Sequence, residues 1–231
     1  MHKRHYFIGE FDLKFIEVKC LDTEIIHQIR DVLKMEIKEE VVLCDGQGKA
    51  VVAEISGISK KEILFSVKQT LPKQINKNKV VLYAAMLKGD NFEWLLQKVV
   101  ETGVDEIVPL TSERTIKTDL NFKRGQKIIK EATEQCERQF LPVLDQVKTF
   151  KDALKSASGE VIFFDPSGED VKKVKINNKA ISVFIGPEGG WSDNEIELAQ
   201  KANVTILNLG SSILRGETAA TAATYLAKNV L

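Results

Sequence analysis

Cysteine and histidine are scarce in this sequence, and their positions argue against two common kinds of site. The three cysteines stand singly at Cys20, Cys44 and Cys136, and the three histidines all fall at or before His27. A structural zinc site needs clustered Cys and His ligands, and a disulfide framework needs an even set of closely spaced cysteines. We therefore expect neither a bound metal ion nor disulfide bonds.

Net charge and long apolar runs are also missing. The 33 basic side chains balance 33 acidic ones, and the pI is about 6.9. No broad positive field would draw the chain to nucleic acid, so any contact with RNA has to be local, and DNA is not an expected partner. No apolar run is long enough for a signal peptide or a membrane-spanning helix. The expected location is the cytoplasm, without a membrane partner.

Two nucleotide-binding motifs are absent as well. No G-x-x-x-x-G-K-[ST] segment occurs, which argues against a nucleoside triphosphate loop. No G-x-G-x-x-G follows the first strand of the α/β region, where a dinucleotide enzyme would carry it. Gly46-Gln47-Gly48 lies in a β-rich segment and lacks the third glycine. The glycine loops cluster near the C-terminus instead.

The chain's 231 residues have 43% hydrophobic and 29% charged side chains, which is typical of a globular protein of two domains. Residues 1–72 predict a small β-rich module with one helix, capped by Asp22. Short apolar runs flank a hairpin-type turn at 45–48. Around Leu71-Pro72-Lys73 the chain becomes polar and lysine-rich, so we place the domain boundary there.

Residues 73–231 show alternating strands and helices, which predicts an α/β domain with a parallel sheet covered by helices on both faces. One helix is expected from about Asn91 to Gly103, and Ser192 with Glu195 forms a capping box that begins another. The buried strands are expected at 80–86, 105–110, 161–165, 181–186 and 205–210.

Two glycine-containing loops each follow a predicted strand near the C-terminus. Ile185 begins the segment IGPEGG, and LGSSILRGETAA covers 209–220. Glycine allows positive φ and close approach of the backbone, and ligands of open α/β sheets bind beyond the carboxyl ends of the strands. The pattern predicts one ligand crevice, although a tight strand-to-helix turn would look the same. Arg215 and Glu217 are a structural ion pair or catalytic groups.

These two segments together resemble the paired signature of the SPOUT superfamily, and more narrowly that of the RsmE family, bacterial 16S rRNA (uridine-N3)-methyltransferases. The resemblance spans nearly the whole chain. The family more often has threonine where Gly216 stands. Further matching segments are Arg4-His5-Tyr6-Phe7, His27, Val32-Leu33-Lys34, Lys88, Gln97-Lys98, Glu101, Gly103, Pro109, Ser112-Glu113-Arg114, Glu134-Gln135-Cys136 and Arg138.

The resemblance implies a PUA-like β-barrel over 1–72 that binds RNA and a SPOUT methyltransferase domain over 73–231 with a C-terminal trefoil knot. It also implies an antiparallel homodimer, S-adenosylmethionine as methyl donor, and 16S rRNA as partner, within the 30S subunit. The residues expected to bind the cofactor are Gly186, Pro187, Glu188, Gly189, Gly190, Leu209, Gly210, Ile213, Leu214 and Arg215.

Methyl transfer to uridine N3 requires loss of the proton on that nitrogen, so a positioned acceptor and a cation near the resulting anion are needed. We expect Glu217 to supply the first and Arg215 the second. Six side chains are expected to contact RNA phosphates. For some of them, a position on a solvated helix or at the edge of the core is an equally good explanation. The six are Arg4, His27, Lys88, Arg114, Arg124 and Arg138.

Two other functions fit the same sequence features. A SPOUT enzyme with another target, such as the ribose of a tRNA, would need the same cofactor. A non-catalytic RNA-binding adaptor would retain the small barrel, but the intact glycine loops argue against it.

Overall fold

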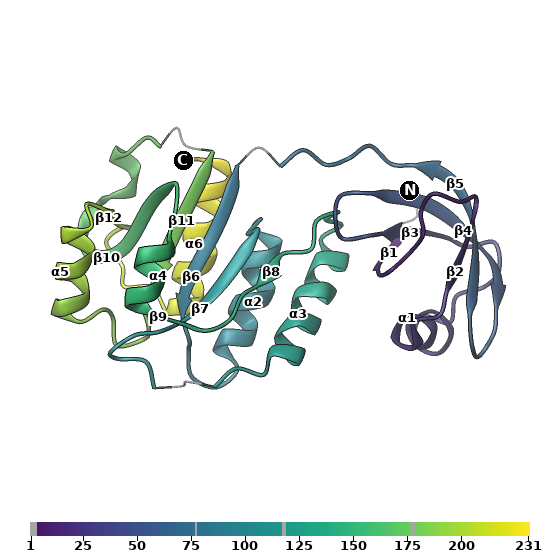
Figure 1. Ribbon diagram of the computed structural model, residues 1–231, viewed down its shortest axis with the longest axis horizontal. Coiled ribbons are helices and arrows are strands. Elements are labelled where there is room, and N and C mark those ends of the chain that lie inside the picture. Colours follow the sequence, from purple (N-terminus) through teal and green to yellow (C-terminus); the bar gives the residue numbers. More distant parts are fainter. Residues whose placement is uncertain (1–3, 77, 117–118, 177–178) are drawn as a thin grey trace. The chain divides into compact units, whose positions relative to one another are not determined.

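A computed structural model describes residues 4–76, 78–116, 119–176 and 179–231 (Figure 1). The chain forms two compact units. The first comprises Met1–Ile75 together with Thr133–Leu141, and the second comprises Asn76–Ala132 with Pro142–Leu231. Among the described residues, no helix has the length and apolar character needed to cross a membrane.

The first unit is built on a five-stranded sheet in the order β1-β3-β4-β5-β2, in which β1 runs parallel to β3 and the other neighbours are antiparallel. The predicted helix α1 begins after Asp22, whose carboxylate accepts hydrogen bonds from two backbone N–H groups, and it continues into a π-helical turn at Gln28–Val32. The strands are β1 (His5–Ile8), β2 (Glu17–Cys20), β3 (Glu40–Cys44), β4 (Ala50–Ile58) and β5 (Ile63–Thr70), and α1 spans Thr23–His27.

Residues far along the chain complete this unit. Glu134 is buried, and its carboxylate accepts a hydrogen bond of 2.8 Å from the backbone N of Ile8 in β1. The carbonyl oxygen of Gln139 accepts hydrogen bonds from Gly48 N and from the thiol of Cys44. Burial raises the pKa of the Cys44 thiol. The segment 133–141 is therefore fastened to the strands of the first unit by buried polar contacts.

The second unit has a parallel sheet in the order β12-β10-β11-β6-β7-β8, and β9 pairs with β7. Its strands are β6 (Lys79–Ala85), β7 (Glu106–Thr111), β8 (Val143–Leu144), β9 (Lys148–Thr149), β10 (Glu160–Asp170), β11 (Ala180–Ile185) and β12 (Thr205–Asn208). Its helices are α2 (Asn91–Glu101), α3 (Phe122–Gln135, which ends in the first unit), α4 (Phe150–Ser156), α5 (Asp193–Lys201) and α6 (Gly216–Asn229), with a 3₁₀ turn at Val171–Lys173.

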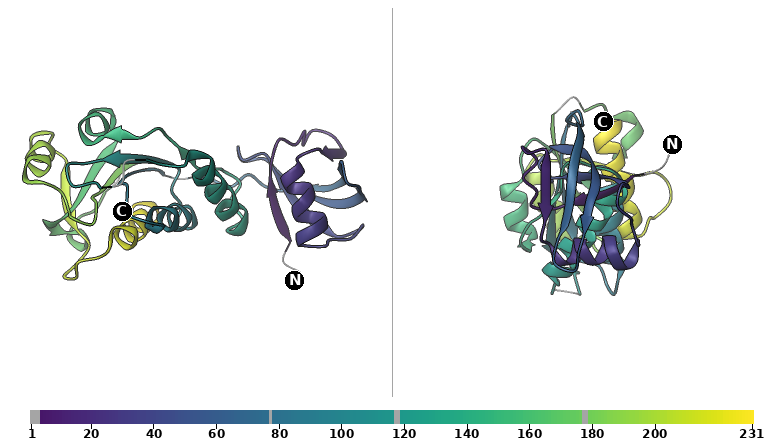
Figure 2. Two further views of the ribbon diagram at one scale, coloured as in Figure 1. Left: turned by 90° about the horizontal axis from the view of Figure 1, so that it is seen from below. Right: turned by 90° about the vertical axis from the view of Figure 1, so that its right-hand side faces the viewer.

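Helices cover both faces of this sheet, as expected for an α/β domain: α2 and α6 lie on one face, and α4 and α5 on the other (Figure 2). The core under α4 and α5 is aromatic, with the rings of Tyr83 and Phe184 stacked 4.5 Å apart on neighbouring strands. All the predicted strands of this domain form. Parallel pairing brings the carboxyl ends of β10, β11 and β12 to one edge of the sheet. The knot expected from the resemblance stays a prediction.

Candidate functional site

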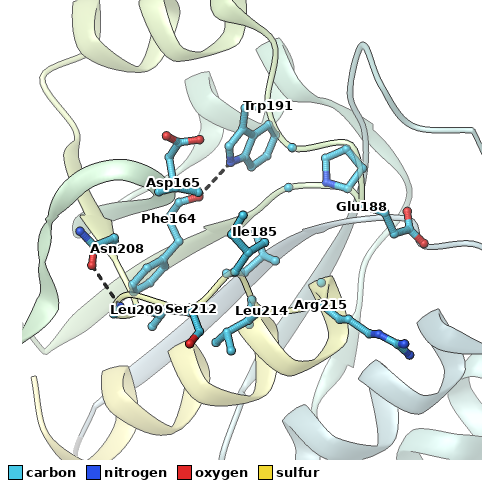
Figure 3. A pocket seen from close by; sticks show the side chains of 18 of the residues that line it. Phe164, Asp165, Ile185, Glu188, Trp191, Asn208, Leu209, Ser212, Leu214 and Arg215 are labelled. Atoms are coloured by element: carbon cyan, nitrogen blue, oxygen red, sulfur yellow. Dashed lines mark hydrogen bonds between the residues drawn. The ribbon is translucent and has the colours of Figure 1, made fainter.

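A cavity of about 870 Å³ lies at the carboxyl ends of β10, β11 and β12. Its walls come from three segments of the second unit: the bulged part of β10, the loop after β11 and the loop after β12 (Figure 3). The lining residues are Phe164, Asp165, Pro166, Asp170, Ile185 to Trp191, Asn208 to Gly216, and Ala219.

The loop 186–190 takes its shape from the backbone and from Trp191. Gly190 has a φ of +69°, and its N–H donates to the Pro187 carbonyl at 2.9 Å. A Cβ atom on Gly186 would lie 3.0 Å from the Trp191 ring, so the backbone approaches the indole more closely than a side chain would allow. The buried Trp191 donates from Nε1 to the carbonyl of Phe164 at 3.0 Å. This bond joins the loop to the end of β10.

The loop 209–215 starts from Asn208, whose side chain is held by two hydrogen bonds. Its Nδ2 donates to the Gly168 carbonyl at 2.6 Å, and its Oδ1 accepts from Gly210 N at 3.0 Å. Gly210 has a φ of +118°, which favours glycine. No heavy atom of the described residues lies within 4 Å of the place a Cβ on Gly210 would take. Backbone therefore forms an open part of the wall here.

The ten residues expected to bind a cofactor all line this one cavity, although their binding role stays a prediction. The third wall, from Phe164 to Asp170, was not predicted. Its pairing with β12 shifts register between Phe164 and Glu169, so the intervening residues bulge out beside the cavity. The signal in the sequence is a polar Asp-Pro-Ser-Gly run directly after a buried strand.

The two residues expected to be catalytic lie in different environments. Arg215 is exposed and lines the cavity, and its side chain extends toward the same end as the Glu188 carboxylate (Figure 3). Glu217 is buried in the first turn of α6 and is not among the lining residues. Its Oε2 atom has no hydrogen-bond partner among the described residues. The catalytic roles of Arg215 and Glu217 stay predictions.

Of the basic residues expected to contact RNA, two adjoin the loop 186–190. Arg114 donates from Nη1 to the carbonyl of Gly189 at 2.9 Å. The backbone N of Lys88 donates to the Glu188 carboxylate at 2.9 Å, while the Lys88 residue is exposed. Arg124, on α3, pairs with Glu93 of α2. Lys117, a further basic residue between Arg114 and Arg124 in the sequence, lies outside the described residues.

The other three expected RNA contacts belong to the first unit. Arg4 forms an ion pair with Glu40 at 2.7 Å, and 43% of the Arg4 side chain is exposed. His27 lies 2.8 Å from the Asp31 carboxylate, which also accepts from Arg30. The pKa of Asp31 falls to about 2, chiefly through the hydrogen bond from Arg30 and then that from His27. Arg138 follows the end of α3, and its backbone N–H donates to the Thr133 carbonyl.

Comparisons with known proteins agree with this architecture. Residues 74–228 match the model of an RNA methyltransferase domain, and residues 21–68 match that of an RNA methyltransferase PUA domain. The first unit is therefore PUA-like, and its sheet precedes the α/β domain along the chain.

Named relatives cover most of the chain. Ribosomal RNA small subunit methyltransferase E of Mesomycoplasma hyopneumoniae is 32% identical over 93% of this chain and 94% of its own length. The protein of the same name from Rickettsia conorii is 29% identical over 84% and 82%. The crystal structure of the Neisseria gonorrhoeae enzyme of this name, bound to S-adenosyl methionine, superposes with a TM-score of 0.89 at 28% identity, covering 96% of this chain and 95% of that one. This chain therefore belongs to the ribosomal RNA small subunit methyltransferase E family, the RsmE family of RNA methyltransferases.

Proposed function

We propose that this protein transfers the methyl group of S-adenosylmethionine to N3 of a uridine in 16S rRNA. The observation that carries the proposal is that both glycine loops of the family signature line one shared cavity at the strand ends. Relatives named as small-subunit rRNA methyltransferases support the substrate class, and the Neisseria relative bound to S-adenosyl methionine supports the methyl donor.

The cavity fits this cofactor in size and in the chemistry of its walls. A volume of about 870 Å³ is that of a pocket for a nucleoside-sized ligand. Ile185, Leu209 and Leu214 offer apolar surface for a base, and the glycine backbone at Gly190 and Gly210 is open to a ligand. Backbone N–H and C=O groups on such loops can recognise the polar atoms of an adenosine without any side chain.

When bound there, the cofactor would supply an electrophilic methyl group on a positively charged sulfur. The chain would have to prepare the uridine, because N3 carries a proton and has no free lone pair. Arg215, in the cavity wall, can stabilise the negative charge that develops over the base when the proton leaves. Glu217 follows two residues later and has one carboxylate oxygen without a partner among the described residues, so it is our candidate to accept the proton.

The target nitrogen lies on the Watson–Crick edge of uridine, so the base has to be unpaired or extruded from its helix. We propose that residues 1–72 bind the RNA and that 73–231 carry out the transfer, the assignment expected from the sequence. Arg114, Arg124 and Lys88 are exposed residues of the unit that contains the cavity, and their positive charge suits phosphate contacts. Arg4, His27 and Arg138 are the candidates in the PUA-like unit.

A homodimer acting on the 30S subunit in the cytoplasm completes the proposal. Apolar side chains exposed on α2 and at the end of α6 support a protein interface. Trp94 is 44% exposed, Tyr225 53% and Val230 65%. Exposed apolar surface of this kind is typical of a contact between subunits. Sedimentation of the purified chain tests this part: a monomer at micromolar concentration contradicts it.

The catalytic assignment is tested by Arg215→Ala and Glu217→Gln in single-turnover methyl transfer, with cofactor binding measured separately. We expect each to slow transfer by about 10²-fold or more, the usual contribution of an acid–base or charge-stabilising group. Thr218→Ala, beside Glu217 on the exposed face of α6, is the matched control. Near-native rates in both variants would rule the assignment out.

A further inference from the structure

One buried carboxylate lies outside the cavity and joins two segments that are distant in the sequence. Glu195, in the first turn of α5, is 2% exposed. Its Oε2 accepts from Ser192 N at 2.9 Å and closes the capping box, while its Oε1 accepts from Glu113 N at 3.0 Å. Both oxygens are therefore bonded to backbone N–H groups, one from the start of α5 and one from the loop after β7.

A second contact ties the same two segments together. The amide of Asn194 donates to the Glu113 carboxylate at 2.7 Å, and this bond, followed by one from Ser192, lowers the pKa of Glu113. The loop after β7 is itself closed, because Thr115 N donates to the Ser112 carbonyl at 3.1 Å. Arg114 thus follows Glu113, which is held by two contacts with the start of α5, and lies within a tight turn.

Arg114 uses this fixed position to contact the glycine loop from outside the cavity. Its Nη1 donates to the carbonyl of Gly189 at 2.9 Å, and its side-chain carbons lie 3.5 to 3.6 Å from where a Cβ on Gly189 would be. The next residue back, Glu188, is held by Lys88 N. Glu188 and Gly189 are neighbours in a loop that lines the cavity, and each is thus held by a hydrogen bond from the loop that follows another strand.

We propose that Arg114 and Glu195 are positioning residues that keep the loop 186–190 in the shape that binds the cofactor. The inference rests on the proposed function. A glycine-rich loop loses more conformational freedom on ordering than other segments do. If hydrogen bonds already hold the loop in its bound shape, less of that entropy is lost when the cofactor binds, and the affinity is higher. Arg114 holds the carbonyl of Gly189, and Glu195 holds Arg114 by fixing the backbone of Glu113. RNA phosphate can still contact the remaining N–H groups of the exposed guanidinium.

The test measures the dissociation constant for S-adenosylmethionine by calorimetry in the full-length protein, without RNA. Arg114→Ala removes the bond to Gly189, and Arg114→Lys keeps a charge that can reach the carbonyl with one donor. Glu195→Gln leaves only one acceptor oxygen for two N–H groups. Glu197→Gln is the matched control, because Glu197 lies on the same helix, is 60% exposed and pairs only with Lys201 among the described residues.

We expect Arg114→Ala to weaken cofactor binding about tenfold, the size of effect of one charge-assisted hydrogen bond. Arg114→Lys should recover part of that loss, Glu195→Gln should weaken binding several-fold in the same way, and Glu197→Gln should bind like the native chain. Since Glu195 is buried, its variant can lose stability, and the two Arg114 variants then decide the question alone.

Two outcomes would overturn the inference. Native cofactor affinity in Arg114→Ala would mean that the loop needs no support from Arg114. A raised KM for RNA in a separate methyl-transfer assay, together with unchanged cofactor affinity in calorimetry, would mean that Arg114 acts only on phosphate. If the native chain itself fails to bind S-adenosylmethionine, the proposed function is wrong, which is a result distinct from either of these.

Discussion

Gly216 is buried at the first position of α6, and adding a methyl group there should destabilise the protein. A Cβ atom would lie 2.8 Å from Cδ2 and 3.3 Å from Cδ1 of Leu87, a side chain that is fully buried. Its φ is not in the left-handed region, so strain of the backbone is not the issue. The family more often has threonine here, and the space a Cβ would need is filled by Leu87 in this chain.

The expected change in the free energy of unfolding is the difference between two opposing effects. Replacing glycine by alanine in a helix stabilises by about 0.5–1 kcal/mol through the unfolded state. Forcing a methyl group into a packed core costs about 1–3 kcal/mol. We therefore expect Gly216→Ala to lower the free energy of unfolding by about 1 kcal/mol, measured by urea denaturation.

A double-mutant cycle isolates the contact. Leu87→Ala alone should cost about 2–5 kcal/mol by leaving a cavity. Added to it, Gly216→Ala should become neutral or stabilising, so that the two changes are non-additive by about 1 kcal/mol or more. Additive losses, or a Gly216→Ala variant as stable as the native chain, would show that the contact with Leu87 is not the reason for glycine at position 216.

Three further predictions concern other contacts. Lys228→Met should lower the free energy of unfolding by about 3 kcal/mol, because it leaves the mostly buried Asp105 without the ammonium group 2.8 Å away; urea denaturation would contradict this by showing a loss under 1 kcal/mol. Trp191→Phe should cost about 1–2 kcal/mol and weaken cofactor binding, since a buried carbonyl loses its donor, and unchanged stability would refute it. Arg30→Ala should raise the pKa of Asp31 from about 2 toward 3.8 in an NMR titration; because the folded pKa is lowered, the carboxylate's contribution to stability is present above 3.8 and lost as the pH falls toward 2.

The α/β domain was predictable because its five longer strands are apolar runs between helical patterns, and the parallel pairing follows from that alternation. The strands β8 and β9 have two residues each, too few to show any pattern, and were missed. Two strands of the first unit, β1 and β2, were missed: each has only four residues, too few to show a clear alternation. The placement of 133–141 with the first unit depends on the contacts of Glu134 and Gln139 with residues more than 90 positions earlier. Periodicity carries no information about such contacts.

The site was predicted in two of its three walls. The glycine loops stand out because they follow strands directly. Asp165 and Pro166 resemble an ordinary turn in the sequence, and only the bulge in the pairing of β10 with β12 places them beside the cavity. The contact of Arg114 with Gly189 could not be predicted from the sequence either, because the sequence shows only a basic residue near a helix. The residue type gives the charge at a position, but the atoms that the charged group contacts depend on the tertiary structure.

Methyl transfer to a defined nucleotide tests the central claim most directly. The purified protein would be incubated with S-adenosylmethionine labelled on its methyl group and with either 30S subunits or naked 16S rRNA, and the modified nucleoside would be identified by digestion and mass spectrometry. The account predicts label in 16S rRNA as 3-methyluridine at one position. Label on a ribose, label confined to another RNA, or no label from a protein that binds the cofactor would contradict it.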